Sequence, residues 1–194
     1  PGERADAPAG AELAGPRAPR RAPMPSRPRE PVRAYVGLGS NLDDPVAQVR
    51  SALDELGELP HTLRVAQSSL YRSPPMGPAG QPDYVNAVAV LDTGLEPRAL
   101  LRELQAIEAR HGRVRGAERW GPRTLDLDLL VYGDWRSSDP GLTVPHPGIG
   151  ERPFVLWPLL EVAPGLRVPG LGVVRALVRG LDPLQPALPG GSQR

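Results

Sequence analysis

Apolar residues recur with two different periods along the middle of this chain. Apolar residues two apart, or in short runs, predict strands over residues 34–39, 63–72, 84–91 and 124–132. Apolar residues three and four apart predict helices over residues 45–56 and 96–111, followed by shorter ones over 154–162 and 173–181. Either Asp43 or Asp44 can cap the first helix, and Pro158 interrupts the third.

The order of these elements predicts the fold class. Strand, helix, strand, strand, helix, strand over residues 34–132 is the ferredoxin-like βαββαβ arrangement. It gives an α+β fold with an antiparallel sheet that carries two helices on one face. We expect loops and the C-terminal helices to cover the other face. The result is a three-layer α-β-α sandwich with a ligand cleft beside the sheet.

The two ends of the chain differ from its middle in composition. Residues 1–32 are rich in proline, alanine and arginine and nearly free of large apolar side chains. Such a segment cannot bury enough surface to offset the entropy of ordering it, so we predict a disordered tail or linker. A catalytic domain is predicted over residues 33–181, and a flexible Pro/Gly-rich tail over residues 182–194.

Two aspartates stand two residues apart inside the last apolar run. In a strand, Asp126 and Asp128 point to the same face, while the leucines between them point into the core. Two neighbouring carboxylates on a buried strand repel each other unless a cation lies between them. A solvated strand face is the alternative, because Asp-x-Asp is a common pattern. Five arginines within fourteen residues favour metal and phosphate, and these are Arg110, Arg113, Arg115, Arg119 and Arg123.

Composition narrows the chemistry further. The chain contains no cysteine, which excludes disulfides and cysteine-based metal sites. All 23 basic residues are arginines, so a P-loop lysine and a Schiff-base lysine are excluded. No apolar run reaches the length of a membrane span and no signal-peptide pattern opens the chain, so we expect a cytoplasmic protein.

Several motifs identify a resemblance. They are residues 37–42 (GLGSNL), 71–78 (YRSPPMGP), 81–86 (QPDYVN), 112–115 (GRVR), 118–128 (ERWGPRTLDLD) and 142–146 (LTVPH). In this order and spacing, the chain from residue 35 to about residue 181 resembles the 6-hydroxymethyl-7,8-dihydropterin pyrophosphokinases of the folate pathway. The resemblance implies transfer of the β,γ-pyrophosphoryl group of ATP to the hydroxymethyl oxygen of the pterin, with AMP released.

The same resemblance implies the catalytic and metal residues. Asp126 and Asp128 would bind two Mg²⁺ ions, which prefer carboxylate, phosphate and water oxygens. Arg113 and Arg123 resemble the family's catalytic-loop arginines, and guanidinium groups match phosphate geometry. Residues 113–122 read as a mobile loop that closes over the substrates, as it does in the family.

The resemblance also implies contacts with ATP. We expect them from Gln105, Glu108, Arg115, Leu129, Thr143, His146 and Arg152. Taken alone, Gln105 and Glu108 look like solvent-facing residues three apart on a helix. A lone histidine is most often structural, and His146 is not expected to bind Mg²⁺, which disfavours imidazole.

A flat pterin ring needs aromatic faces and hydrogen-bonding edges. The resemblance places these contacts at Ser73, Pro74, Met76, Tyr84, Asn86, Trp120 and Phe154. Asn86 offers both a donor and an acceptor to the ring edge. A core role is the alternative for Trp120 and for Phe154.

The sequence departs from the family at three positions. Gly116 stands where the family has a lysine, Gly141 where an arginine is frequent, and Pro147 where a tyrosine is frequent. These departures fall on the nucleotide side, so they affect the expected ATP affinity more than the reaction.

Two other classes of function compete with the enzyme. A non-catalytic ferredoxin-like module that binds a nucleotide or effector explains the fold but leaves the Asp pair beside five arginines unexplained. A single-stranded nucleic-acid binder needs a basic face with sheet aromatics, whereas the net charge is +1 and aromatics make up 4%. We therefore expect no nucleic-acid or membrane partner. We expect a monomer, either alone or fused to or associated with another folate-pathway enzyme.

Overall fold

The computed structural model describes residues 30–77, 80–113 and 121–187 of the 194-residue chain. They form a six-stranded sheet in which β10, β3, β4, β1 and β5 are neighbours in that order and β2 also pairs with β4. All of these pairings are antiparallel. The strands are β1 (Val32–Ser40), β2 (Thr62–Gln67), β3 (Tyr71–Ser73), β4 (Tyr84–Thr93), β5 (Asp126–Tyr132) and β10 (Gln185–Pro186).

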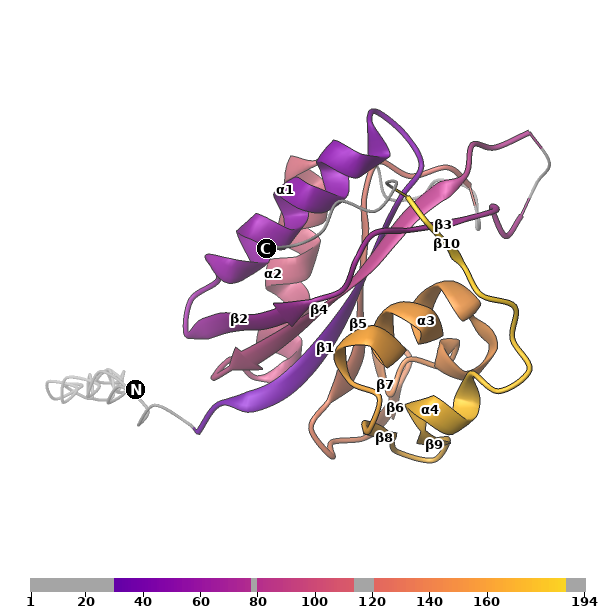
Figure 1. The fold of residues 1–194 in the computed structure, drawn as a ribbon. Helices are drawn as coiled ribbons and strands as arrows, with labels where there is room; N and C mark the ends of the chain where they lie inside the picture. The colour runs from indigo at the N-terminus through magenta and orange to yellow at the C-terminus, as the bar shows by residue number, and fades with distance from the viewer. Residues whose placement is uncertain (1–29, 78–79, 114–120, 188–194) are drawn as a thin grey trace, which may run out of the picture.

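Helices cover both faces of this sheet (Figure 1). One face carries α1 (Pro45–Gly57) and α2 (Pro97–Arg110), and the other carries α3 (Pro153–Val162) and α4 (Val174–Leu177). The smaller elements are β6 (Ser137–Asp139), β7 (Leu142–Val144), η1 (Ile149–Glu151), β8 (Arg167–Val168) and β9 (Gly172–Val173). The predicted α+β class is confirmed. Within the described ranges, no helix has the length and apolar character needed to cross a membrane.

Alternation along the central strands divides the core in two. On β1, Ala34, Val36 and Leu38 are buried against α1 and α2, whereas Tyr35 belongs to the cluster under α3 and α4. Successive side chains of a strand point to opposite faces, so a strand buried on both sides must be apolar at almost every position. This explains why the strands read as continuous apolar runs.

The two long helices follow the predicted pattern. Asp44, rather than Asp43, caps α1: its side chain accepts a hydrogen bond from the Ala47 amide at 3.2 Å, and Pro45 occupies the first turn. On α2, Leu100, Leu104 and Ile107 are fully buried. The amphipathic spacing therefore predicted correctly which side of each helix is buried against the sheet.

The strand predicted over residues 63–72 is instead two strands, β2 and β3. At the break, the Val88 amide donates to the hydroxyl of the buried Ser68 at 2.9 Å, and the Ser68 amide donates to the Val88 carbonyl at 2.9 Å. A serine side chain thus takes over one main-chain bond of the ladder. Residue spacing did not reveal this, because serine fits both strands and turns.

Both ends of the predicted domain also differ from expectation. The helix predicted over residues 173–181 is only α4, with Gly180 at φ 85° shortly after it. Residues 185–187 belong to the sheet edge instead of a flexible tail, because β10 pairs with β3 and the Ala187 amide donates to the Leu70 carbonyl at 2.8 Å. Most of the predicted N-terminal tail lies outside the described residues, but Val32 already begins β1.

Candidate functional site

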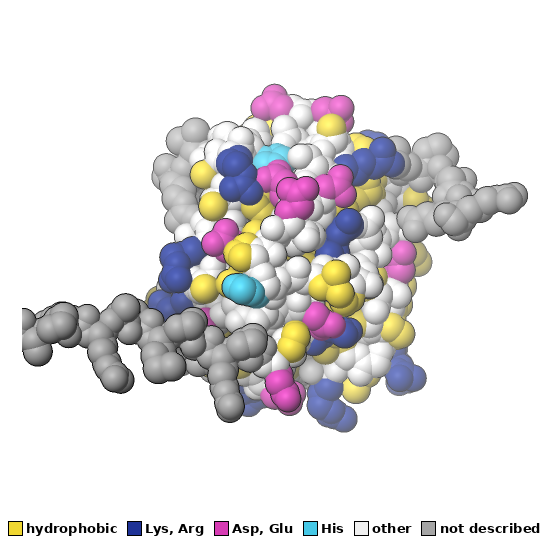
Figure 2. Space-filling view, turned by 90° about the vertical axis from the view of Figure 1, so that its left-hand side faces the viewer, with side chains coloured by type: hydrophobic (Ala, Val, Ile, Leu, Met, Phe, Trp, Pro, Cys, Tyr) yellow, Lys and Arg dark blue, Asp and Glu magenta, His cyan; other side chains and the backbone are white. Residues whose placement is uncertain are grey.

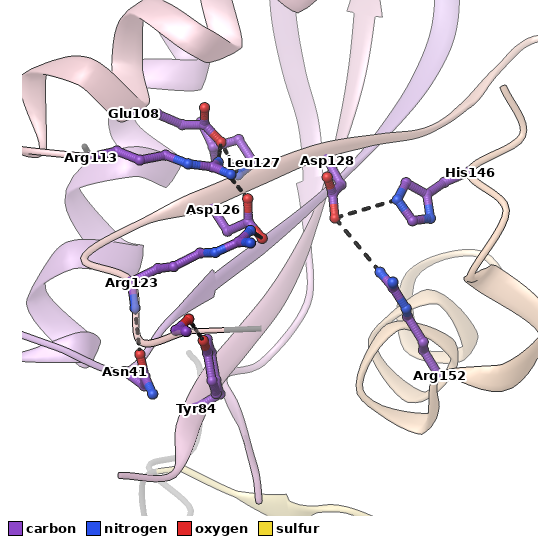
Figure 3. A network of polar contacts seen from close by, with 11 residues as sticks. Asn41, Tyr84, Glu108, Arg113, Arg123, Asp126, Leu127, Asp128, His146 and Arg152 are labelled. Carbon is purple, nitrogen blue, oxygen red and sulfur yellow. Dashed lines mark hydrogen bonds and ion pairs between the residues drawn. The ribbon is translucent and has the colours of Figure 1, made fainter. Parts of the chain in front are cut away.

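A cavity of about 380 Å³ opens on the α3 side of the sheet, where β1, β3, β4 and β5 meet the segment that leads into α3. Twelve side chains expected at the site line it: Ser73, Pro74, Met76, Tyr84, Asn86, Arg113, Arg123, Asp126, Asp128, His146, Arg152 and Phe154. Figure 3 shows how the charged members converge from β5, from the two sides of the undescribed segment 114–120, and from the start of α3.

The two aspartates lie on the face of β5 that the alternation predicts. Asp126 and Asp128 line the cavity, while Leu125, Leu127 and Leu129 are buried against α1 and α2. Their partners across the β1–β5 ladder are Gly39 for Asp126 and Gly37 for Asp128. A Cβ at Gly37 would lie 3.3 Å from the Leu130 side chain, and one at Gly39 would lie 3.4 Å from Asn86 Oδ1, so a side chain at either position would crowd the cavity lining.

Two arginines hold Asp126. The Arg113 Nη1 atom lies 2.5 Å from Asp126 Oδ1, and the Arg123 Nη1 atom lies 2.7 Å from Asp126 Oδ2 (Figure 3). The main chain of Arg123 is itself fixed, because its amide donates to the side-chain oxygen of Asn41 at 2.8 Å and its carbonyl accepts from the Asn41 amide at 3.1 Å. Each oxygen of one carboxylate therefore faces a guanidinium group.

Glu108 connects this arrangement to α2. It is 4% exposed, accepts a hydrogen bond from the Leu127 amide at 2.8 Å, and pairs with Arg113. Burial raises the pKa of Glu108 to about 6, against the opposing effects of the Leu127 amide and the Arg113 charge. The side chain is thus neither solvent-facing nor part of the cavity lining; it joins the C-terminal half of α2 to β5.

Asp128 has a looser environment. Its Oδ2 atom lies 3.7 Å from His146 Nε2 and 3.9 Å from Arg152 Nη1 (Figure 3). The enclosed position of Asp128 and the neighbouring Asp126 carboxylate raise its pKa. Burial lowers the pKa of His146, and its Nδ1 atom accepts from the Gly148 amide at 3.1 Å, which places the proton of the neutral ring on Nε2, facing Asp128.

The opposite wall of the cavity is less charged. The Asn86 amide donates to the hydroxyl of the buried Ser73 at 2.9 Å, and the Tyr84 hydroxyl donates to the Gly121 carbonyl at 3.2 Å. Phe154 also lines the cavity, with the Arg152 guanidinium 5.9 Å from its ring centroid. Aromatic surface beside hydrogen-bonding groups suits a flat polar ring.

Some expected residues lie elsewhere. The side chain of Leu129 is packed in the α1/α2 core, so it cannot reach the cavity on the other face of β5. Thr143 belongs to the β6–β7 hairpin and donates to the Asp139 carbonyl at 3.0 Å, and Gln105 lies on α2. None of the three lines the cavity. Arg115 and Trp120 lie outside the described residues.

The structure also adds lining residues that were not selected from the sequence. These are Gly37, Leu38, Gly39, Ala87, Leu130, Pro147 and Val155. The glycine pair had a readable signal, because Gly-x-Gly inside an apolar strand indicates a close approach of other groups. Leu130, Ala87 and Val155 look like ordinary core residues in the sequence.

The residues present fit a hard divalent cation. Asp126 and Asp128 offer carboxylate oxygens, the ligands that Mg²⁺ prefers. No group of three or more His, Asp or Glu side chains that could hold a metal occurs among the residues that the structure describes. The protein would therefore supply part of an Mg²⁺ shell, which leaves positions for phosphate and water oxygens.

The face drawn in Figure 2 carries charges of both signs. On the face drawn in Figure 2, Asp and Glu side chains lie among the Arg side chains instead of leaving a continuous basic area. Together with the cavity, the fold defines a small α+β protein with paired carboxylates and arginines, a class of site suited to metal-assisted transfer of phosphate groups.

Comparison with known proteins gives the family. A family model described as 7,8-dihydro-6-hydroxymethylpterin-pyrophosphokinase (HPPK) matches residues 35–164. The 2-amino-4-hydroxy-6-hydroxymethyldihydropteridine pyrophosphokinase of Pseudomonas aeruginosa is 56% identical over 137 residues, which is 71% of this chain and 84% of that protein. The protein of the same name from Haemophilus influenzae is 49% identical over 148 residues, or 76% and 92% of the two chains. The chain belongs to the HPPK family and is a pyrophosphokinase.

Solved structures agree on the fold. Wild-type HPPK-DHPS of Plasmodium falciparum superposes with a TM-score of 0.58 at 14% sequence identity, over 78% of this chain and 41% of that one. The chain therefore spans less than half of that structure. At this identity the likeness supports the fold alone.

Proposed function

We propose that this cavity carries out the family's reaction with the residue roles given below. As a member of the HPPK family, the chain transfers a pyrophosphoryl group from ATP to 6-hydroxymethyl-7,8-dihydropterin in folate biosynthesis. The observation that carries the assignment is one cavity floor bearing Asp126 and Asp128, with Arg113 and Arg123 on one side and Asn86 on the other. A non-catalytic binding module leaves this combination without a purpose.

In this reaction the hydroxymethyl oxygen of the pterin attacks the β-phosphorus of ATP. The bond from that phosphorus to the oxygen bridging to the α-phosphate breaks, AMP leaves with the bridging oxygen, and the hydroxyl proton is lost to solvent. Asp126 and Asp128 would hold two Mg²⁺ ions, which when bound neutralise phosphate charge and orient the phosphate chain. The chain itself binds, orients and encloses the reactants.

Arg113 and Arg123 would change partners when ATP arrives. In the structure both guanidinium groups pair with Asp126. Phosphate oxygens would offer them a more highly charged partner of matching geometry, which would leave the Asp126 carboxylate available as a metal ligand. The arginines would then stabilise the charge that develops between AMP and the migrating group.

The pterin would lie against the opposite wall. Asn86, held by Ser73, would meet the ring edge, with Tyr84, Pro74, Met76 and Phe154 around the ring. Trp120 lies outside the described residues and stays an expected ring contact.

Nucleotide contacts would come from His146 and Arg152 beside Asp128. Arg115 lies outside the described residues and stays an expected contact. Contacts from Gln105, Glu108 and Thr143 would need a nucleotide that extends beyond the described cavity. Any contact from Leu129 would have to use its main chain, because its side chain is in the core.

We also infer that the core is ferredoxin-like. β2 and β3 together occupy one strand position beside β4, which gives the βαββαβ order within a three-layer sandwich. We further propose that the protein acts as a monomer. Folic acid synthesis protein fol1 of Schizosaccharomyces pombe, 39% identical over 133 residues, is matched over 18% of its length, which supports the idea of related chains within larger folate-pathway polypeptides.

A product assay tests the proposal. The protein is incubated with ATP and Mg²⁺, with and without 6-hydroxymethyl-7,8-dihydropterin, and AMP is measured by chromatography. We expect AMP only when the pterin is present, and an Asp126→Asn variant slower by about a thousandfold because the metal loses a carboxylate. An Asp54→Asn variant, changed on the exposed side of α1, should keep full activity. Pterin-independent AMP release, or an undiminished Asp126→Asn enzyme, would refute the assignment.

A further inference from the structure

Glu161, near the C-terminal end of α3, forms hydrogen bonds with a segment that lies much earlier in the chain, between β2 and the start of β3. The Ser69 amide donates a hydrogen bond shared by the two carboxylate oxygens, at 3.0 and 2.9 Å. The Ser69 hydroxyl donates to the same carboxylate at 2.9 Å, and the Tyr71 hydroxyl donates to it at 2.8 Å. Three donors from the β2–β3 region thus meet a single carboxylate. Hydrogen bonds to an ionised acceptor are stronger and more directional than neutral ones.

These contacts fall at the break between β2 and β3. Ser69 directly follows Ser68, whose side chain replaces a ladder bond, and Tyr71 is the first residue of β3. Burial and the Glu161 carboxylate raise the pKa of Tyr71 to about 12, so its hydroxyl keeps the proton that it donates. Glu161 therefore fixes the position at which β3 begins.

The start of β3 is connected to the cavity through Asn86. The Asn86 amide nitrogen lies 3.5 Å from the Tyr71 carbonyl and donates to the Ser73 hydroxyl at 2.9 Å. Both Asn86 and Ser73 line the cavity. A shift of β3 along β4 would move both of these acceptors and reorient the Asn86 amide.

The same helix supplies the facing wall. Phe154 lies seven residues before Glu161 on α3, which is two helical turns and about 10 Å along the same side of the helix. One end of α3 presents Phe154 to the cavity, and the other end holds β3. The contact thus joins the wall that carries Phe154 to the wall that carries Ser73 and Asn86.

We propose that Glu161 is a positioning residue for the pterin: it fixes β3 to α3 and so sets the spacing between the hydrogen-bonding edge and the aromatic wall of the cavity. This inference rests on the function proposed above. Other contacts also hold β3, namely its pairing with β4 and with β10. Loss of Glu161 should therefore loosen the spacing without unfolding the domain.

The test measures both substrates in Glu161→Ala, Glu161→Gln and Tyr71→Phe. For Glu161→Ala we expect the KM and Kd of the pterin to rise roughly three- to tenfold, with the KM of ATP within about twofold of the wild type. Glu161→Gln keeps one oxygen acceptor and should lie in between, and Tyr71→Phe, which removes one donor, should show the smallest rise. Pterin Kd comes from fluorescence titration without ATP.

A matched control separates positioning from general destabilisation. Asp92→Asn removes the pair with Arg33, 2.5 Å long, which joins β1 and β4 away from the cavity. It should lower the thermal midpoint about as much as Glu161→Ala does and leave both KM values unchanged. An unchanged pterin KM and Kd in all three variants, or an equal rise for ATP and pterin, would overturn the inference. If Glu161→Ala fails to fold, the other two variants decide it; if the wild type makes no AMP with pterin, the proposed function itself fails.

Discussion

Asp126 and Asp128 are the same residue type, two positions apart on one face of one strand, yet their surroundings differ. Asp126 is held at 2.5 and 2.7 Å by two arginines, whereas Asp128 lies 3.7 and 3.9 Å from His146 and Arg152. Both oxygens of the first carboxylate are paired with guanidinium groups. The second carries a raised pKa, because its enclosed position and the charge of Asp126 disfavour ionisation. One carboxylate is thus closely paired, whereas the cationic neighbours of the other are more distant.

The partner exchange at Asp126 can be tested by removing one arginine. An Arg123→Met variant should lose about a hundredfold in kcat, because a phosphate contact is missing in the transition state. Without nucleotide, however, it should bind Mn²⁺ about tenfold more tightly than the wild type, since one competing positive charge has left Asp126. Mn²⁺ affinity is measured by electron paramagnetic resonance on the protein alone.

The control for this experiment is Arg98→Met, which removes an exposed arginine paired with Asp139. This variant should change neither kcat nor the affinity for Mn²⁺. If Arg123→Met bound Mn²⁺ more weakly in the absence of nucleotide, the arginine would not be competing with the metal, and the contrast between the two aspartates would lose its meaning.

Glu108, which pairs with Arg113 beside Asp126, makes the stability of the protein depend on pH. Its pKa of about 6 in the folded protein is above its ordinary value of 4.5, so the folded state binds the proton more tightly than the unfolded state. Its contribution to stability is therefore fully present below pH 4.5 and is lost as the pH rises to about 6, by about 2 kcal/mol. The difference in unfolding free energy between the wild type and Glu108→Gln, from urea titrations at several pH values, should fall over this range.

A Glu108→Gln difference that rises with pH would mean that the pairing with Arg113 outweighs burial.

The smallest expected effect is on stability: replacing the two aspartates should change the free energy of unfolding in opposite directions. Asp128→Asn should raise the free energy of unfolding at pH 7 by a few tenths to about 1 kcal/mol, because it removes a disfavoured charge that solvent in the cavity partly screens. Asp126→Asn should lower it by about 1 kcal/mol, because two arginines lose their charged partner. Urea unfolding of both variants measures these two changes in free energy. Changes of the same sign would show that the two carboxylates are equivalent in the folded protein.

Much of the site was predictable, because strand alternation and short motifs indicate which side chains share a face. The alternation along β5 placed Asp126 and Asp128 on one face, and the motif matches placed Ser73, Tyr84, Asn86 and Phe154 around the same cavity. The side chain of Leu129, which was expected to meet ATP, follows the alternation of the strand into the core, so this prediction now rests on its main chain. Where the prediction was wrong, a long-range contact decided. Residues 185–187 looked like a tail because only β3, more than a hundred residues earlier, gives them hydrogen-bond partners.

The sequence by itself determined the α+β class, the order of the helices and strands, the family, and the face on which the paired carboxylates lie. These depend on periodicity and on short motifs, which the chain displays locally. The tertiary structure alone decided that Arg113 and Arg123 pair with Asp126, that Glu108 is buried against β5, and that Glu161 reaches back to β3. Charge pairing and burial depend on which segments meet in space, and no spacing along the chain specifies those distances.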